Sequence, residues 1–362
     1  MPLLALIVPE SPLRTRQRFD VLGAVLFGFG IGGVLIYVSE GASWGWGSIN
    51  TLGYLIGGVV LIAAFLLWES RISFPIMDLK LLRSPKVSMV MTASLVATAA
   101  ATLPQYTLPQ YTLPQYTLPY MFETPVPAAL KAQILAGVSA KEHVPVSLIE
   151  KFVYFRGDIN YAAGYSVFQL AWHVIIFTSV SGMIIGPIGG FMARRYGARL
   201  PLILAGVSFL ASFILWSQFH SIWWQSATIG LLWGAGFGFF YAAGPNLLMD
   251  AVPACVMGIS AAMLAVFGSI GSSLATALAT PILTSHPFQL VATPPGGKPV
   301  ITNIPQVYTD PGYTQVYLII GGIVGLATLI VALVLRSGRE PARGGLLPEL
   351  TATDADAMTA GT

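Results

Sequence analysis

Stretches of about twenty mostly apolar residues recur along the chain, and they restrict its fold more than any other feature. They occupy residues 21–39, 51–68, 87–104, 165–192, 200–217, 222–249, 256–283 and 316–335. An α-helix needs about 20 apolar residues to cross the hydrocarbon core of a bilayer. The pattern therefore predicts an all-α fold: a polytopic membrane helix bundle with about eight transmembrane helices, whose main partner is the lipid bilayer.

The shortage of charged residues supports the same interpretation. Of the 362 residues, 55% are hydrophobic and only 9% are charged, whereas soluble domains average roughly 25% charged residues. So few charges leave too little polar surface to cover a globule in water. The basic residues form no continuous face, so we predict no nucleic-acid partner.

Residue types that support metal binding or catalysis are sparse. Cys255 is the only cysteine and the four histidines are widely spaced, so we predict neither a metal site nor a cofactor. A membrane-embedded enzyme would need paired acids, a histidine-rich metal site, or a nucleophile beside its base. The apolar stretches contain no such grouping, and we predict that the protein is not an enzyme.

Basic residues mark one side of the predicted membrane. Thirteen of the 18 Lys and Arg residues precede the first span, follow the last, or lie in every second connection. They are Arg14, Arg16, Arg18, Arg71, Lys80, Arg83, Lys86, Arg194, Arg195, Arg199, Arg336, Arg339 and Arg343. Because basic loops stay in the cytoplasm, we predict a multi-pass protein of the cell membrane with both termini cytoplasmic.

A tandem repeat interrupts the pattern after the third apolar stretch. Residues 102–116 contain Thr-Leu-Pro-Gln-Tyr three times. Proline at every fifth position removes helix hydrogen bonds, so we expect this stretch to end the third span and to continue extended or kinked. We interpret it as a short duplication rather than as a selected functional element. Residues 105–163 and 284–314 are predicted outer loops, and residues 337–362 a disordered cytoplasmic tail.

His173 is the only ionisable side chain placed well inside a predicted span. Such a group is costly to bury and is a functional candidate for that reason. It could bind substrate or carry a proton near neutral pH, or simply donate a hydrogen bond to a neighbouring helix. No carboxylate is predicted at the middle of the membrane.

The segment Gly190-Phe-Met-Ala-Arg-Arg-Tyr-Gly-Ala-Arg199 closes the fourth span. It resembles the cytoplasmic loop motif of the major facilitator superfamily, Gly-x-Leu-Ala-Asp-Arg-x-Gly-Arg-Arg. Five positions match that motif: Gly190, Ala193, Arg195, Gly197 and Arg199. Arg194 stands where the motif has Asp, which puts the motif's role as a conformational lock in doubt.

Several longer segments narrow the resemblance. Arg18-Phe-Asp-Val-Leu-Gly-Ala precedes the first span, Trp68-Glu-Ser-Arg ends the second, and Asp250-Ala-Val-Pro follows the sixth. As a set they look like the fourteen-span drug:proton antiporter (multidrug efflux) family. The resemblance implies that residues 1–20 are the stump of a preceding helix and a cytoplasmic segment, and residues 21–84 are two linker transmembrane helices. Residues 85–336 would be the C-terminal six-helix domain, without the N-terminal one.

The resemblance also implies a function, the proton-driven efflux of small amphipathic substrates. Half of such a transporter should be inactive alone and would have to pair with a separate N-terminal half. The loop-motif residues would act in the conformational switch. The substrate cavity is predicted from Tyr165, Gln169, His173, Trp233, Tyr241 and Asn246. The alternative is a non-transporting degenerate remnant or a structural membrane protein.

Overall fold

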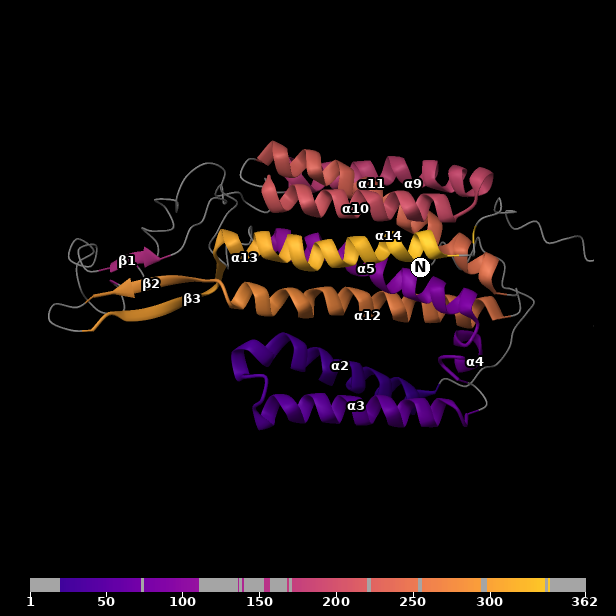
Figure 1. The fold of residues 1–362 in the computed structure, drawn as a ribbon, viewed down its shortest axis with the longest axis horizontal. Helices are drawn as coiled ribbons and strands as arrows, with labels where there is room; N and C mark the ends of the chain where they lie inside the picture. Colours follow the sequence, from indigo (N-terminus) through magenta and orange to yellow (C-terminus); the bar gives the residue numbers. More distant parts are fainter. Residues whose placement is uncertain are drawn as a thin grey trace, which may run out of the picture.

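The computed structural model describes residues 20–72, 75–110, 136, 139, 153–156, 168, 171–219, 223–252, 256–293, 298–335 and 338. Within these ranges, eight helical segments are long and apolar enough to cross a membrane. They run side by side along the long axis of the molecule (Figure 1). The predicted all-α, multi-pass helix bundle is therefore confirmed.

Most helix ends lie within a few residues of the predicted spans. The end of the third span, discussed below, does not, and the predicted start of the fourth span at residue 165 lies outside the described residues. The first two, α2 (Val21–Trp44) and α3 (Ile49–Glu69), form an antiparallel pair. The others are α4 (Leu79–Leu82), α5 (Pro85–Gln110), α9 (Ile176–Tyr196), α10 (Arg199–Gln218), α11 (Trp223–Ala251), α12 (Met257–Thr284), α13 (Asp310–Gln315) and α14 (Gly322–Val334). A π-helical turn at Ala171–Ile175 leads into α9, and a second at Val316–Gly321 joins α13 to α14.

The helices α2 and α3 lie to one side of the others, and α2 packs against α12 (Figure 1). On the far side of α12, α5 and α14 occupy the middle of the bundle, and α9, α10 and α11 form the opposite side. Four of the most buried aromatic side chains, Phe209, Phe213, Trp216 and Tyr317, come from α10 and the π-helical turn before α14. The packing of these helices thus encloses an aromatic cluster.

The tandem repeat does not end the third span at Pro104, and that prediction was wrong. Helix α5 continues through Pro104 and Pro109 to Gln110. Proline has no N–H, so a proline at position 104 leaves the carbonyl of Ala100 without its helical donor. The indole Nε1 of Trp233 donates to this carbonyl instead, at 3.3 Å. A neighbouring helix therefore supplies the hydrogen bond that Pro104 removes.

The first repeat copy and the start of the second contact other helices. Leu103 and Thr107 are fully buried, and the Thr107 hydroxyl lies 2.9 Å from the Tyr317 hydroxyl. The Thr102 hydroxyl donates to the Ser272 Oγ at 2.9 Å. Such contacts between polar side chains hold membrane helices together. The third copy lies outside the described residues.

The two predicted outer loops contain a small sheet. Strands β1 (Val153–Arg156), β2 (Pro287–Ala292) and β3 (Val300–Tyr308) pair antiparallel in the order β1-β2-β3. The sheet extends beyond one end of the helices (Figure 1). The sequence predicted outer loops here but not this sheet, because the β1–β2 pairing joins segments far apart in the sequence.

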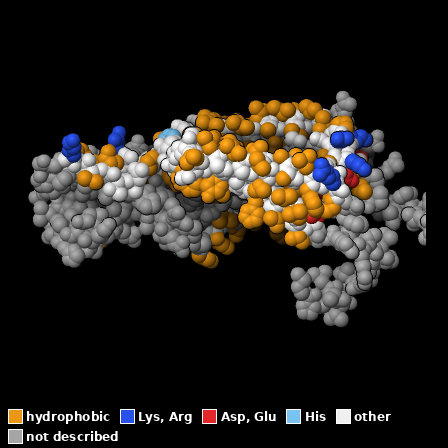
Figure 2. All heavy atoms as spheres, turned by 90° about the horizontal axis from the view of Figure 1, so that it is seen from below, with side chains coloured by type: hydrophobic (Ala, Val, Ile, Leu, Met, Phe, Trp, Pro, Cys, Tyr) orange, Lys and Arg blue, Asp and Glu red, His pale blue; other side chains and the backbone are white. Residues whose placement is uncertain are grey.

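Basic side chains gather at the end of the bundle opposite the sheet (Figure 2). We call this the basic end, and define it by Arg71 after α3, Lys80 in α4, Lys86 in α5, Arg194 in α9 and Arg199 in α10. The sheet side also carries basic residues. This distribution agrees with the sequence argument for orientation, which stays a prediction.

Candidate substrate cavity

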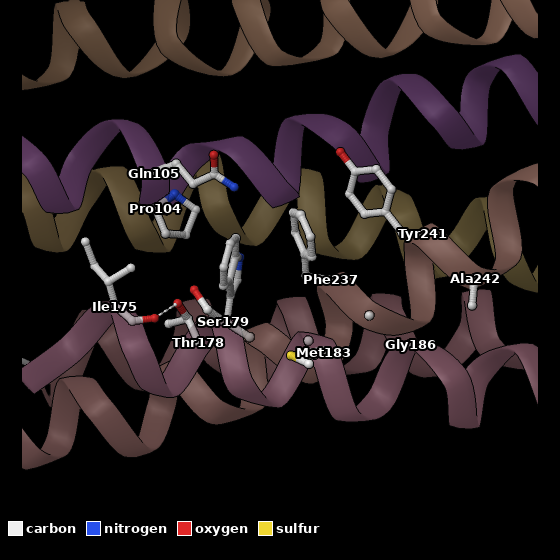
Figure 3. A pocket seen from close by; sticks show the side chains of 13 residues that line it. Pro104, Gln105, Ile175, Thr178, Ser179, Met183, Gly186, Phe237, Tyr241 and Ala242 are labelled. Atoms are coloured by element: carbon white, nitrogen blue, oxygen red, sulfur yellow. Dashed lines mark hydrogen bonds between the residues drawn. The ribbon is translucent and has the colours of Figure 1, made fainter. Parts of the chain in front are cut away.

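A cavity of about 710 Å³ lies between α5, α9 and α11 (Figure 3). Its walls are mainly apolar and aromatic, and none of the thirteen described residues that line it is charged. They are Pro104, Gln105, Ile175, Thr178, Ser179, Gly182, Met183, Gly186, Trp233, Phe237, Gly238, Tyr241 and Ala242. The volume falls in the range of small-molecule sites, which are mostly apolar with few polar groups.

Glycines bring α9 and α11 into backbone contact along one wall. A Cβ placed on Gly238 of α11 would lie 2.8 Å from the carbonyl oxygen of Gly182 and 2.9 Å from the backbone nitrogen of Gly186. Small residues allow such an approach between membrane helices. Because Gly182, Gly186 and Gly238 also line the cavity, their missing side chains contribute to the open volume.

Three aromatic side chains spaced four residues apart on α11 form another part of the cavity wall. The ring centroids of Trp233 and Phe237 are 5.6 Å apart, and those of Phe237 and Tyr241 are 4.5 Å apart. Trp233 is 5% exposed and its indole N–H is bound to the Ala100 carbonyl, whereas Tyr241 is 56% exposed. This wall suits a flat apolar ligand, which aromatic rings can stack against.

Few polar groups reach the cavity. Gln105 on α5 and Ser179 on α9 are both exposed and lie on facing walls (Figure 3). The Thr178 hydroxyl instead donates to the carbonyl of Ile175 at 2.7 Å, so its hydrogen is already bonded. A ligand would therefore be oriented by few hydrogen bonds and held mainly by apolar contact.

The structure places two of the six predicted cavity residues on the cavity wall, Trp233 and Tyr241. His173 lies outside the set that lines it, with its ring edge-on to Trp223 at 5.3 Å. Asn246 donates from Nδ2 to the carbonyl of Ala242 within its own helix, at 2.7 Å. Tyr165 and Gln169 lie outside the described residues.

Several cavity residues were missed by the sequence argument. Pro104 and Gln105 were assigned to the interruption after the third span, because the helix was expected to end there. Met183 and Phe237 are ordinary apolar residues of a span and carry no local signal. The glycines at four-residue spacing in the fourth and sixth spans were the usable signal, since they predict that two helices approach closely.

The loop motif ends α9 as its glycine requires. Gly197 has φ +89°, a conformation that L side chains rarely adopt, and its N–H donates to the Ala193 carbonyl at 3.0 Å. Ala193 is fully buried, whereas Gly190 has open space beside it. Arg195 is exposed, with its guanidinium carbon 5.5 Å from the centre of the Tyr196 ring.

Arg199 links the start of α10 to the end of α14. Its Nε donates to the Ala332 carbonyl at 3.0 Å and its Nη2 donates to the Leu333 carbonyl. The last carbonyls of a helix lack partners within the helix, so Arg199 caps α14. Its backbone N–H donates to Gly338, whose own N–H donates to Asp250 Oδ2 at 2.6 Å. Hydrogen bonds at the basic end therefore connect α10, α11 and α14.

Comparison with known proteins gives distant similarity to resistance and export proteins. The chain is 26% identical over 281 residues to the multidrug resistance protein Stp of Mycobacterium tuberculosis, covering 77% of this chain and 43% of that protein. It is 22% identical over 288 residues to the tetracenomycin C resistance and export protein of Streptomyces glaucescens, covering 78% and 44%. The lincomycin resistance protein LmrB of Listeria monocytogenes is 31% identical over 75 residues, which is 21% of this chain and 16% of that protein.

The chain spans less than half the length of the first two of these relatives. No protein-family model matches it. The similarity therefore relates the chain to membrane export proteins at low identity.

Proposed function

We propose that this chain is the C-terminal part of a proton-coupled multidrug exporter of the major facilitator superfamily, from its fourteen-span branch. The cavity between α5, α9 and α11 would take small amphipathic compounds. The basic end and both termini would face the cytoplasm. The observation that carries the proposal is an uncharged aromatic cavity in a bundle whose relatives are named for drug resistance and export.

The cavity would be completed by a second half. Met183 is 80% exposed and Tyr241 is 56% exposed, although both line the cavity. Transporters of this kind alternate access by rocking one half against the other around a site near the bilayer midplane. We therefore propose that a separate N-terminal six-helix half covers these side chains, and that this chain alone does not pump.

In this proposal, the predicted cavity residues differ in how they reach the substrate, and Arg199 has a separate role. Trp233 and Tyr241 would contact the substrate directly, while His173 and Asn246 would reach it only if their helices moved. Arg199 would act in the conformational switch, because separation of α10 from α14 must break its bonds to the carbonyls of α14.

Efflux of a fluorescent amphipathic cation from cells tests the proposal. The chain would be expressed alone and together with an N-terminal six-helix half of an export relative, at matched amounts in the membrane. We expect efflux only with both halves, and its loss with an uncoupler that dissipates the proton gradient. Efflux by the chain alone would contradict the need for a second half.

A matched pair of substitutions on α9 tests the cavity itself. Met183→Trp should fill the cavity and abolish efflux, because Met183 lines it. Ile184→Trp should retain efflux, because Ile184 is also exposed on α9 but is not among the lining residues. Equal losses in both variants would show that the cavity is not the substrate site.

The alternative is a structural membrane protein that transports nothing. Arg194 in place of the motif's Asp favours it, because a cation then stands where the lock uses an anion. In that case the chain would accumulate in the membrane, yet no N-terminal half would restore efflux.

A further inference from the structure

Two carboxyl groups meet at the basic end of the α2–α3 pair, far along the chain from the cavity residues. Asp20 immediately precedes α2 and Glu69 is the last residue of α3. Because the two helices are antiparallel, these positions lie at the same end. Asp20 is 8% exposed and Glu69 is 4% exposed, so both carboxyl groups are removed from water.

The hydrogen-bond donors around the pair are distributed unequally. Asp20 accepts from the backbone N–H of Gly23 at 3.0 Å and from the indole Nε1 of Trp68 at 3.0 Å and 3.2 Å. Glu69 Oε1 accepts from the backbone N–H of Met77. Glu69 Oε2 is buried and has no hydrogen-bond partner among the described residues. Asp20 is therefore solvated as an anion, while one oxygen of Glu69 is not.

The unpartnered oxygen faces Asp20 across Gly23. The position that a Cβ would take on Gly23 is in contact with Asp20 Oδ2 and lies 3.3 Å from Glu69 Oε2. Glycine at this position leaves the space between the two oxygens open. Two carboxylates that face each other across one glycine, away from water, cannot both be ionised without a large cost, so one of them keeps a proton.

We propose that Asp20 and Glu69 form a proton-binding site, in which a proton on Glu69 Oε2 joins the two carboxyl groups. The N–H donors on Asp20 compensate a negative charge on its carboxyl group. A metal cation does not suit the site, because the other described groups that point into it are the N–H donors of Gly23, Trp68 and Met77. Hard cations instead require six or more oxygen ligands.

Among the described residues around the pair, the charged side chains lie between the end of α3 and the first turn of α5. Helix α12, which packs against α2, contains no charged or histidine residue between Met257 and Thr284. Asp78 accepts from the backbone N–H groups of Lys80 and Leu81 and caps α4. Arg71 follows α3 and is exposed. Among the described residues, the carboxyl group that faces Glu69 is that of Asp20.

The site connects α2, α3 and the segment before α4, so the proton at this site should affect how these elements are held together. Asp20 holds the start of α2, Trp68 and Glu69 hold the end of α3, and Met77 belongs to the segment that enters α4 and α5. Loss of the proton would place two negative charges side by side in a buried site. The α2–α3 pair should then separate from the start of α5, which makes their attachment dependent on pH.

Infrared spectroscopy of the purified full-length chain in detergent tests the site directly. We expect the carbonyl stretch of a protonated carboxyl group at neutral pH, where exposed carboxyl groups are ionised. Glu69→Gln should remove this band, since the amide can still donate to Asp20 but carries no acid. Glu40→Gln, on the same helix pair but hydrogen-bonded to Ser43 at the opposite end, should leave the band unchanged.

The wild-type chain gives a second readout that needs no variant. As pH rises, the band should disappear together with a fall in thermal stability, and in Glu69→Gln that fall should be absent. Absence of the band from the wild-type chain at neutral pH would overturn the proposal, as would a band that persists in Glu69→Gln. These measurements involve no transport, so their result is independent of the proposed export function.

Discussion

The hydrogen bond from Trp233 to the Ala100 carbonyl should contribute more to the free energy of unfolding in this chain than in a variant without Pro104. Ala100 and Trp233 are 0% and 5% exposed, so water cannot replace the indole as a donor. Replacing Trp233 with Phe removes the N–H and leaves the Ala100 carbonyl unpaired. Replacing Pro104 with Ala restores a backbone N–H four residues after Ala100, which can take over as the donor.

The expected size of this coupling follows from the environment. A buried polar group that loses its partner costs about 1–3 kcal/mol, while hydrogen bonds between membrane helices average about 0.6 kcal/mol and reach about 1.7 kcal/mol. We therefore expect Trp233→Phe to cost about 1–2 kcal/mol more in the wild-type background than in Pro104→Ala. The packing lost with the larger ring is common to both backgrounds and cancels in the comparison.

A double-mutant cycle measures the coupling. The wild-type chain, Trp233→Phe, Pro104→Ala and the double variant would be unfolded by detergent titration in mixed micelles and followed by circular dichroism. Unrelated substitutions add to within about 0.5 kcal/mol. If the cost of Trp233→Phe is the same in both backgrounds within that limit, the indole does not replace the hydrogen bond that Pro104 removes.

Three further predictions concern other parts of the chain. Gly238→Ala should destabilise the fold by about 1–3 kcal/mol through overpacking, whereas Gly186→Ala, where a Cβ meets nothing within 4 Å, should change the same unfolding titration by less than about 0.5 kcal/mol. Arg199→Gln should reduce hydrogen-exchange protection in the last turn of α14, while Arg195→Gln should leave it unchanged. Burial raises the pKa of Tyr308 in β3, so as pH rises this tyrosine ionises in the unfolded chain before it does in the folded one. The stability of the fold should therefore decrease as pH rises above about 10. An alkaline titration of stability should show this decrease in the wild-type chain and not in Tyr308→Phe.

The membrane spans could be predicted from the sequence because hydropathy is a local property. Each span must satisfy the same length and polarity limits whatever its neighbours are. The end of the third span was placed wrongly because it depends on a neighbour instead. Helix α5 passes Pro104, and Trp233 beside it supplies the hydrogen bond that the proline removes.

The sheet and most of the cavity could not be predicted because they depend on contacts distant in sequence. Val153 pairs with Ala292, and the sequence of neither segment alone indicates which strand it pairs with. Gln105 lines the cavity only because α5 remains helical there. The resemblance to the loop motif rests on residues 190–199 alone. The contact of Arg199 with the end of α14 depends on a distant helix and could not be predicted from that segment.

Trp233 has two roles that restrict each other. Its indole N–H completes the hydrogen bonding of α5, and its ring lies on the cavity wall. A ligand that turned this ring would break the bond to Ala100 and leave a buried carbonyl unpaired, so we expect the ring to keep its orientation when the cavity is filled. Adaptation to ligands of different shape should therefore fall to Tyr241, which is 56% exposed and adjoins the same cavity. The rigid end of the cavity is set by Pro104, and the adaptable end lies two turns farther along α11.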